Sequence, residues 1–501
     1  MKVPHLLAAV LLAASIAAAQ PNEAARPRPN IVFAIADDWG WPHASAYGND
    51  EVCRTPTFDR IAANGILFHH AYVSSPSCTP SRNAILTGQY HWRLGPGGNL
   101  WSVLDTRHRT YPHLLEDAGY FTGSWRKSWG PGDASNWKRY PAGERYKNPE
   151  MFLEAWKDSG KPFCFWFGAS DPHRGYKLHS GRESGMDLSK IKLFDHYPDH
   201  ETVRGDVADY YFEVQRFDRE LGQFLGKLGE RGLLENTLVV VTGDHGMPFP
   251  RCKSNLYDSG ARVPLAIQWP AVIKPGRVVD DFISTTDLAP TFLEAAGLEP
   301  LPVMTGRSLL PMLRAQGSGR LEPGRRDHVL TGKERHTQAQ EAPDTGGTPM
   351  RAIRNHDFLL IRNYRPDRWP AGTPHWQKAS IPGSWLADCD NGPTKTYMVE
   401  NRDLDAAHKR AYELSFGKRP ELELYDLGKD PGQLRNVAGS AEYAGVVAAL
   451  GARLEKDLKA SGDPRVLGGG AETFDRPKYL GGTPKHPAFK GGARRKPKPN
   501  K

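Results

Sequence analysis

The sequence predicts an α/β protein with a mixed, largely parallel sheet flanked by helices, followed by a smaller antiparallel sheet-and-helix unit. Residues 31–36, 163–168 and 237–241 form continuous apolar runs bounded by turn residues, which is typical of buried parallel strands. Each run stops at polar side chains. In open α/β sheets the functional groups gather at the carboxyl ends of the strands, so the three endings predict one shared site.

The residues that end these runs are carboxylates and imidazoles. They are Asp37 and Asp38, then Asp171 and His173, then Asp244 and His245. Acidic residues at strand ends also serve as turn and capping residues, so either pair alone leaves its role open.

Helices are indicated on both sides of the third run. Apolar residues from Val207 to Leu228 recur at helical spacing, which predicts a long amphipathic helix with a core-facing stripe. Asp287 is a candidate N-cap for a helix that runs to Ala296 and is closed by Gly297.

The pattern changes near Arg325. Residues 351–364 and 421–427 are typical of short strands, and residues 443–458 of a closing helix. Gly and Pro between residues 366 and 394 predict long loops there.

We therefore expect four regions. They are a signal peptide at 1–19, a catalytic domain at 28–325, a smaller C-terminal subdomain at 326–468, and a basic Gly/Pro-rich tail without fixed structure at 469–501.

The charge is concentrated in that tail. The chain has 501 residues, 25% of them charged, and a formal net charge of +9. Residues 481–501 hold seven of the basic residues and no acid, so the remainder carries only +2. A nearly neutral body with a solvated basic appendage does not favour nucleic acid as a partner.

The N-terminus has the pattern of an export signal. Lys2 precedes an apolar run that ends in small residues before Gln20, which is typical of a cleavable signal peptide. The run is short for a membrane span and no later stretch is longer, so we expect an exported, periplasmic or secreted protein rather than an integral membrane protein.

Five cysteines, an odd number in an exported chain, indicate one special thiol. Cys78 stands out because Cys78, Pro80 and Arg82 form a Cys-x-Pro-x-Arg pattern in a loop that enters a helix. The other four are Cys53, Cys164, Cys252 and Cys389, which can form up to two disulfides, although Cys164 lies within a predicted buried strand.

With this pattern the chain resembles the sulfatase family, from about Asn30 to Leu313. The resemblance implies an alkaline-phosphatase-like fold and oxidation of Cys78 to formylglycine (3-oxoalanine) by a formylglycine-generating enzyme or equivalent maturase. The hydrated aldehyde would then attack sulfur and later expel sulfate, which is covalent catalysis.

The resemblance also implies one divalent cation, usually Ca²⁺, held by Asp37, Asp38, Asp244, His245 and the converted Cys78. A hard cation held mostly by oxygen can stabilise both the nucleophile and the charge on a sulfuryl oxygen.

The catalytic set implied by the resemblance is Cys78, Arg82, Lys127, His173 and Lys253. His173 corresponds to the imidazole that protonates the leaving group. Lys127 and Lys253 correspond to lysines that bind sulfuryl oxygens, which adds positive charge to an anionic transition state. A core histidine and surface lysines are the ordinary alternatives for these three.

One position departs from the family pattern. Many sulfatases have a histidine two residues after the first lysine, but here Lys127 is followed by Ser128 and Trp129. We consider His91 and His70 as replacements, and the sequence does not place either of them.

Within the family, the chain looks most like the heparan N-sulfatases, the N-sulfoglucosamine sulfohydrolases. Residues 171–174 (Asp-Pro-His-Arg) and 246–250 (Gly-Met-Pro-Phe-Pro) carry this likeness, with 424–427 and Asn436 in the C-terminal unit. Candidate contacts to a sulfated carbohydrate are Arg174, Glu334, Arg335 and His336.

The leading hypothesis is therefore a calcium-dependent hydrolase that removes sulfate from a sulfated glycan, with N-sulfoglucosamine as the first substrate considered. A carbohydrate O-sulfatase is the alternative, and a non-catalytic protein that binds sulfated glycans is a further one. A phosphatase or phosphodiesterase of the same fold fits less well, because only one compact set of metal ligands is evident and Cys78 has no role in that chemistry.

Overall fold

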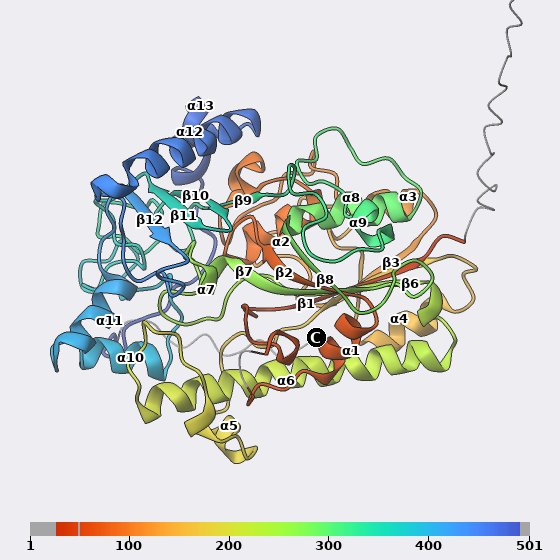
Figure 1. The fold of residues 1–501 in the computed structure, drawn as a ribbon, viewed down its shortest axis with the longest axis horizontal. Helices are drawn as coiled ribbons and strands as arrows, with labels where there is room; N and C mark the ends of the chain where they lie inside the picture. Colours follow the sequence, from red (N-terminus) through yellow and green to blue (C-terminus); the bar gives the residue numbers. More distant parts are fainter. Residues whose placement is uncertain (1–26, 49–50, 491–501) are drawn as a thin grey trace, which may run out of the picture.

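The computed structural model describes residues 27–48 and 51–490, and its main element is an eight-stranded mixed sheet (Figure 1). In spatial order the strands are β4 (Glu144–Tyr146), β3 (Phe121–Arg126), β5 (Phe163–Gly168), β1 (Asn30–Ala36), β6 (Thr237–Gly243), β7 (Arg262–Gln268), β2 (Ile66–Tyr72) and β8 (Arg277–Ser284). The three predicted strands are β5, β1 and β6, which pair in parallel at its centre. The predicted fold class is confirmed.

The helices of the described residues follow in chain order. They are α1 (Pro56–Ala63), α2 (Cys78–Thr87), α3 (Tyr111–Asp117), α4 (Pro149–Trp156), α5 (Ser180–Glu183), α6 (Glu201–Glu230), α7 (Asp258–Ala261), α8 (Leu288–Ala295), α9 (Leu310–Arg314), α10 (Pro393–Glu400), α11 (Ala406–Phe416), α12 (Ala444–Ala460) and α13 (Pro464–Leu467). The helix predicted after Asp287 is α8.

Alternating side chains of the central strands build a core on each face of the sheet. Val32 and Ala34 of β1 pack in the core shared with α1, α4 and α6, whereas Ile31 and Phe33 pack in the core shared with α2, α3 and α8. Figure 1 shows α6 along one face and α3, α8 and α9 over the other. Because a strand's period is two, one apolar run supplies both cores.

The long helix predicted between the second and third runs is α6. Its apolar stripe, including Val207, Val214 and Leu228, is buried against the sheet. The helix therefore spans the sheet face and leads the chain into β6, as the periodicity predicts.

The C-terminal unit is a four-stranded antiparallel sheet in the order β12 (Leu422–Asp426), β11 (Phe358–Asn363), β10 (Met350–Asn355) and β9 (His328–Lys333). The two predicted strand segments correspond to β10 with β11 and to β12, and the predicted closing helix is α12. The sequence reasoning missed β9, α10 and α11.

The chain after Gly468 is more ordered than expected. Phe474 is fully buried, His486 stacks on Trp376 with ring centroids 4.9 Å apart, and Lys485 forms a β-bridge with Ser384. The expectation of a tail without fixed structure is therefore wrong for residues 469–490. Isolated apolar and aromatic side chains hold this segment against the rest of the protein. Isolated residues of this kind give no periodic pattern in the sequence. Residues 491–501 lie outside the described residues.

All five cysteines are buried and free, so the two disulfides that we considered do not form. Among the described residues, none of the helices has the length and apolar character needed to cross a membrane. The predicted signal peptide lies outside the described residues.

Asp218 of α6 supports the start of α1. Its carboxylate accepts hydrogen bonds from the backbone N–H groups of Thr57 (2.9 Å) and Phe58 (2.8 Å), and its side chain is buried. These donors have no partner within their own helix, so a residue 160 positions away acts as the cap.

We predict that Asp218→Ala lowers the free energy of unfolding by about 2–4 kcal/mol, because it leaves two buried N–H groups unpaired. Urea unfolding of the purified variant at pH 7.5 measures this. Gln223→Ala, on the exposed side of α6, is the control and should change stability by less than about 0.5 kcal/mol. Equal stabilities for the two variants would contradict the capping role.

Candidate functional site

The predicted residues meet at the carboxyl ends of β1, β5 and β6. Asp37 donates its backbone N–H to the carbonyl of Asp171 beyond β5 (2.9 Å), and Asp38 donates its own to the carboxylate of Asp244 beyond β6 (2.8 Å). Asp38 has a φ of 70°, which is uncommon for a residue other than glycine. The three strand ends are thus tied together at the backbone, as the topology predicts.

Cys78 begins α2 and is 2% exposed. Its Sγ lies 3.3 Å from His245 Nε2, 3.8 Å from Asp37 Oδ1 and 3.9 Å from Asp38 Oδ1. Burial raises the pKa of the Cys78 thiol, so the unmodified side chain is protonated at neutral pH and is a poor nucleophile. Chemistry at this position fits a modified cysteine better than a thiolate.

The donor atoms around Cys78 suit a hard cation. Asp38, Cys78 and His245 form one group of candidate ligands, and Asp37, Cys78 and Asp244 form another. His245 Nδ1 lies 3.0 Å from the Gly246 carbonyl, and its Nε2 lies 3.1 Å from Asp38 Oδ1, directed into the cluster. Three carboxylates and one imidazole nitrogen could together hold a divalent cation.

The pKa values of these carboxyl groups reflect both burial and charge. Burial raises the pKa of Asp37. Burial also acts to raise the pKa of Asp38. Electrostatic interactions with Lys253, His173 and His245 outweigh burial, so the pKa of Asp38 is lowered. At Asp244, His245 and Arg82 outweigh burial and hold the pKa well below its usual range.

Three cations balance the carboxylates. Arg82 Nε donates to Asp244 (2.8 Å), Lys127 Nζ lies 2.5 Å from both oxygens of Asp37, and Lys253 Nζ lies 2.9 Å from Asp38 Oδ2. Arg82 is fully buried, and Lys127 keeps 19% of its side chain exposed. The structure therefore brings all the predicted cationic residues to Cys78, with Lys127 nearest to solvent.

His173 lies at the edge of this cluster with 34% of its side chain exposed. Its Nδ1 is 2.5 Å from the Arg174 carbonyl and its Nε2 is 3.9 Å from Asp38 Oδ2. An imidazole that is held on one nitrogen and exposed beside a charged cluster can transfer a proton to a leaving group.

Neither histidine considered as a replacement contacts Cys78 within the described part of the chain. His91 lies beside Ser74, with 2.9 Å between Nδ1 and Oγ, and His70 stacks on Phe282. At the position where many relatives carry histidine, Trp129 donates its indole N–H to Asn83 of α2 (2.7 Å). The imidazole that does contact Cys78 is His245.

All four candidate substrate contacts have partners within the protein, and three of them lie away from Cys78. Arg174 forms a bidentate ion pair with Asp206 (2.7 and 2.8 Å), Glu334 pairs with Arg351 and Arg465, and Arg335 donates to the carbonyl of Pro477. Contact between these three residues and substrate stays a prediction.

His336 is closer to the chemistry, because its Nδ1 lies 2.7 Å from the hydroxyl of Ser77, which precedes Cys78. Burial lowers the pKa of His336 to about 3, so it is neutral at physiological pH.

Sequence reasoning missed Asp390. Its Oδ2 accepts from Lys253 Nζ (2.8 Å), and its ligand atom lies within 4.8 Å of those of Asp38 and His173. The residue sits in the Gly/Pro-rich loop that gives no periodic signal. The closely spaced acids Asp388 and Asp390, in a loop otherwise poor in charge, were the available signal.

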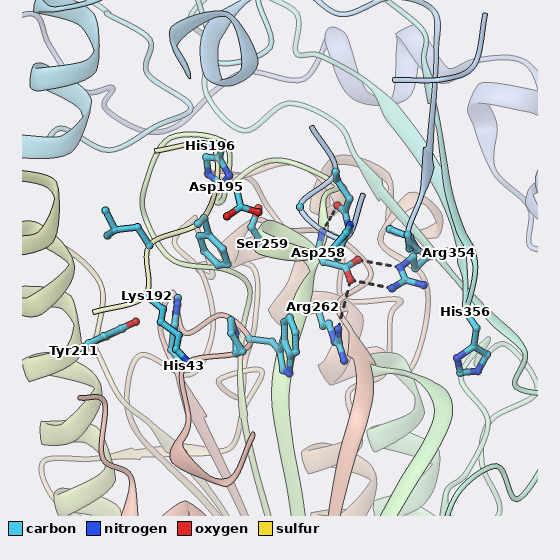
Figure 2. Close-up of a pocket in the computed structure, with 18 residues that line it drawn as sticks. His43, Lys192, Asp195, His196, Tyr211, Asp258, Ser259, Arg262, Arg354 and His356 are labelled. Atoms are coloured by element: carbon cyan, nitrogen blue, oxygen red, sulfur yellow. Dashed lines mark hydrogen bonds and ion pairs between the residues drawn. The ribbon is translucent and has the colours of Figure 1, made fainter. Parts of the chain in front are cut away.

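A separate cavity of about 460 Å³ lies at the seam between the two sheets (Figure 2). Its lining includes His43 and Tyr211 on one side and Arg354 on the other (Figure 2), together with Trp41, and no residue of the Cys78 cluster. Asp258 pairs with both Arg262 and Arg354 there, which satisfies the two guanidinium groups. The chemistry therefore lies with Cys78 and not in this cavity.

Comparisons with known proteins agree with the geometry at Cys78. Residues 29–298 match a family model described as Sulfatase, and residues 243–369 match one described as N-sulphoglucosamine sulphohydrolase, C-terminal. An ulvan-active sulfatase of Formosa agariphila is 26% identical over 491 residues, covering 88% of this chain and 76% of that protein. The N-sulphoglucosamine sulphohydrolase of Homo sapiens is 29% identical over 497 residues, covering 88% of this chain and 92% of that protein.

A solved structure described as a complex with its substrate D-glucosamine-2-N,6-O-disulfate has the same fold. The TM-score is 0.61 at 22% identity, with 87% of this chain and 98% of the other covered.

We predict that Asp38→Asn weakens Ca²⁺ binding at least about tenfold, because a carboxylate ligand is lost while asparagine tolerates the positive φ. Thermal unfolding in a Ca²⁺ titration measures this, since a ligand of the folded state raises Tm with concentration. The control is Asp133→Asn at an exposed loop position, which should titrate like the unaltered protein. Identical titrations for both variants would remove Asp38 from the cation site.

Proposed function

This chain belongs to the sulfatase family, and we propose that it hydrolyses sulfate from a sulfated glycan, with N-sulfoglucosamine as the first substrate to test. The observation that carries the proposal is the meeting of Cys78, three carboxylates and His245 with Lys127 and Lys253 at one sheet edge. We place the catalytic domain at 28–325 and the smaller subdomain at 326–468. We propose that the protein is exported to the periplasm or secreted and matures with a formylglycine-generating enzyme.

Two groups would supply chemistry that the unmodified side chains lack. Cys78 converted to formylglycine would supply a hydrated aldehyde as nucleophile. A bound Ca²⁺, held by Asp37, Asp38, Asp244 and His245, would stabilise negative charge on a sulfuryl oxygen.

The other residues bind and orient the substrate. Lys127 keeps part of its side chain exposed, whereas Lys253 is buried between Asp38 and Asp390, and each would exchange a carboxylate partner for a sulfuryl oxygen. Arg82 is held on Asp244 and on the Lys127 carbonyl, so it fixes the geometry of the cluster from beneath. His173, on the exposed side, donates a proton to the departing sugar atom.

Substrate preference has two sources of support. The match to the N-sulphoglucosamine sulphohydrolase C-terminal model and the human relative favour an N-sulfated glucosamine. A relative from Bacteroides thetaiotaomicron named N-acetylglucosamine-6-O-sulfatase, 24% identical, favours an O-sulfated sugar, so an O-sulfatase is the second candidate. Sulfate release from glucosamine N-sulfate beside glucosamine and galactose O-sulfates separates the two.

We predict that Cys78→Ala abolishes sulfate release from every sugar in that panel, because it removes the group that becomes the nucleophile. The experiment uses protein coexpressed with a formylglycine-generating enzyme, with the mass of the peptide containing residue 78 measured in parallel. The control, Cys164→Ala, removes a buried cysteine of β5 distant from the cluster and should keep activity once it is folded. Normal turnover by folded Cys78→Ala would refute the mechanism, and an unconverted thiol in protein from the native host would favour a glycan-binding role.

We predict that His173→Ala slows sulfate release from sugars by about 10²–10⁴-fold, because an amine or alkoxide leaves poorly without a proton. Release from 4-nitrophenyl sulfate should fall far less, since nitrophenolate needs no acid. His375→Ala, an exposed histidine of the C-terminal unit, is the control. Equal losses on both kinds of substrate would assign His173 a structural role instead.

A further inference from the structure

Asp390 lies where the buried charge cluster meets solvent, and no role given above uses it. Lys253 Nζ bridges Asp390 Oδ2 (2.8 Å) and Asp38 Oδ2 (2.9 Å). The Lys253 side chain is 3% exposed and that of Asp390 is 23% exposed. Asp390 is therefore the acidic member of the cluster that an incoming substrate meets.

The position of Asp390 relative to His173 shows which part of a substrate it faces. The ligand atoms of Asp38, His173 and Asp390 all lie within 4.8 Å of one another. In the roles proposed above, His173 marks the side of the leaving group, whereas Cys78, Lys127 and Lys253 mark the side of the sulfuryl group, and Asp390 lies between Lys253 and His173. With these roles, Asp390 would border the sugar at the atom that carries the sulfate.

A carboxylate at this place is unexpected, because the proposed substrate is itself an anion. An ionised carboxylate only accepts hydrogen bonds and repels a second negative charge. Lys253 and the electrostatic influence of His173 overcome burial and lower the pKa of Asp390, which keeps it ionised. Its Oδ2 is occupied by Lys253, and its Oδ1 accepts no hydrogen bond from the residues that the structure describes.

The loop that carries Asp390 is held firmly. Lys395 donates to the carbonyls of Trp385, Leu386 and Cys389 (2.9, 3.0 and 2.9 Å), and Asn391 donates to the carbonyl of Lys485 in the C-terminal segment (2.9 Å). Because hydrogen bonds hold the backbone on both sides of Asp390, its Oδ1 is a hydrogen-bond acceptor in a fixed position.

We propose that Asp390 determines substrate specificity by accepting a hydrogen bond from a hydroxyl or amine group next to the sulfated atom of the sugar. The same carboxylate excludes sugars that carry a second sulfate or a carboxylate at that neighbouring position. This inference rests on the proposed function and names the substrate class more narrowly: monosulfated sugar units with an unmodified donor beside the sulfate.

The test compares three versions of whichever monosulfated sugar the unaltered protein turns over. The neighbouring carbon carries a hydroxyl group, a hydrogen atom or a second sulfate. For Asp390→Asn we expect kcat/KM on the hydroxyl version to fall about 10- to 100-fold, mainly through KM, because a hydrogen bond to a charged group is lost. The deoxy version should change little, and turnover of the disulfated version should rise.

Asp367→Asn is the matched control in the same Gly/Pro-rich loop. Asp367 is exposed and pairs with Arg365 and not with the charge cluster, so its substitution should leave kcat/KM on all three sugars unchanged. An effect of Asp390→Asn that is equal on all three sugars would overturn the specificity role.

A binding measurement separates this inference from the proposed function. Calorimetric titration of the unconverted Cys78 protein with the same three sugars should give the tightest binding for the hydroxyl version and the weakest for the disulfated version. Asp390→Asn should remove these differences in affinity. Binding with this ranking but without sulfate release after confirmed conversion would refute hydrolysis and support Asp390. Unranked binding would refute the role of Asp390 whether or not sulfate is released, and failure to bind any sulfated sugar would refute both.

Discussion

The site depends on the burial of three carboxylates beside three cations at the edge of the central sheet. Asp37, Asp38 and Asp244 are at most 2% exposed, and each pairs with Lys127, Lys253 or Arg82. Ionised groups are costly to bury, and a buried pair that loses one member leaves an uncompensated charge. The ends of β1 and β6, the start of α2 and the loop before Lys253 are therefore fixed by one network.

The sheet places this network, and the sequence predicts the sheet because buried parallel strands are continuous apolar runs. Polar residues that follow such runs must meet at one edge, so Asp37, Asp244 and His173 could be grouped without a structure. Cys78 and Lys253 lie outside the strands. The local Cys-x-Pro-x-Arg pattern and the odd number of cysteines singled out Cys78, but its role and that of Lys253 came only from the resemblance to the family.

Other features of the site and of the fold had no comparable pattern in the sequence. Asp390 comes from a loop of Gly, Pro and polar residues whose path is set by tertiary contacts such as those of Lys395 and Asn391. The segment after Gly468 looked unstructured because Phe474 and His486 are isolated anchors and form no period. Arg174 and Glu334 looked available to a ligand, but their partners Asp206 and Arg351 are distant in sequence. Periodicity reports which face is buried and not which charges pair across elements.

Trp129 occupies the position where the resemblance to sulfatases led us to expect a histidine, and an indole has no titratable nitrogen. The indole is used to hold Asn83 on α2, so this position supports the helix that presents Cys78. Of the imidazoles in the described residues, His245 contacts Cys78 and His173 faces solvent across Asp38. The Nε2 of His245 lies 3.3 Å from Cys78 Sγ and 3.1 Å from Asp38 Oδ1. Under the proposed function, the nucleophile at position 78 and the cation would share this imidazole, and the leaving group would depend on His173.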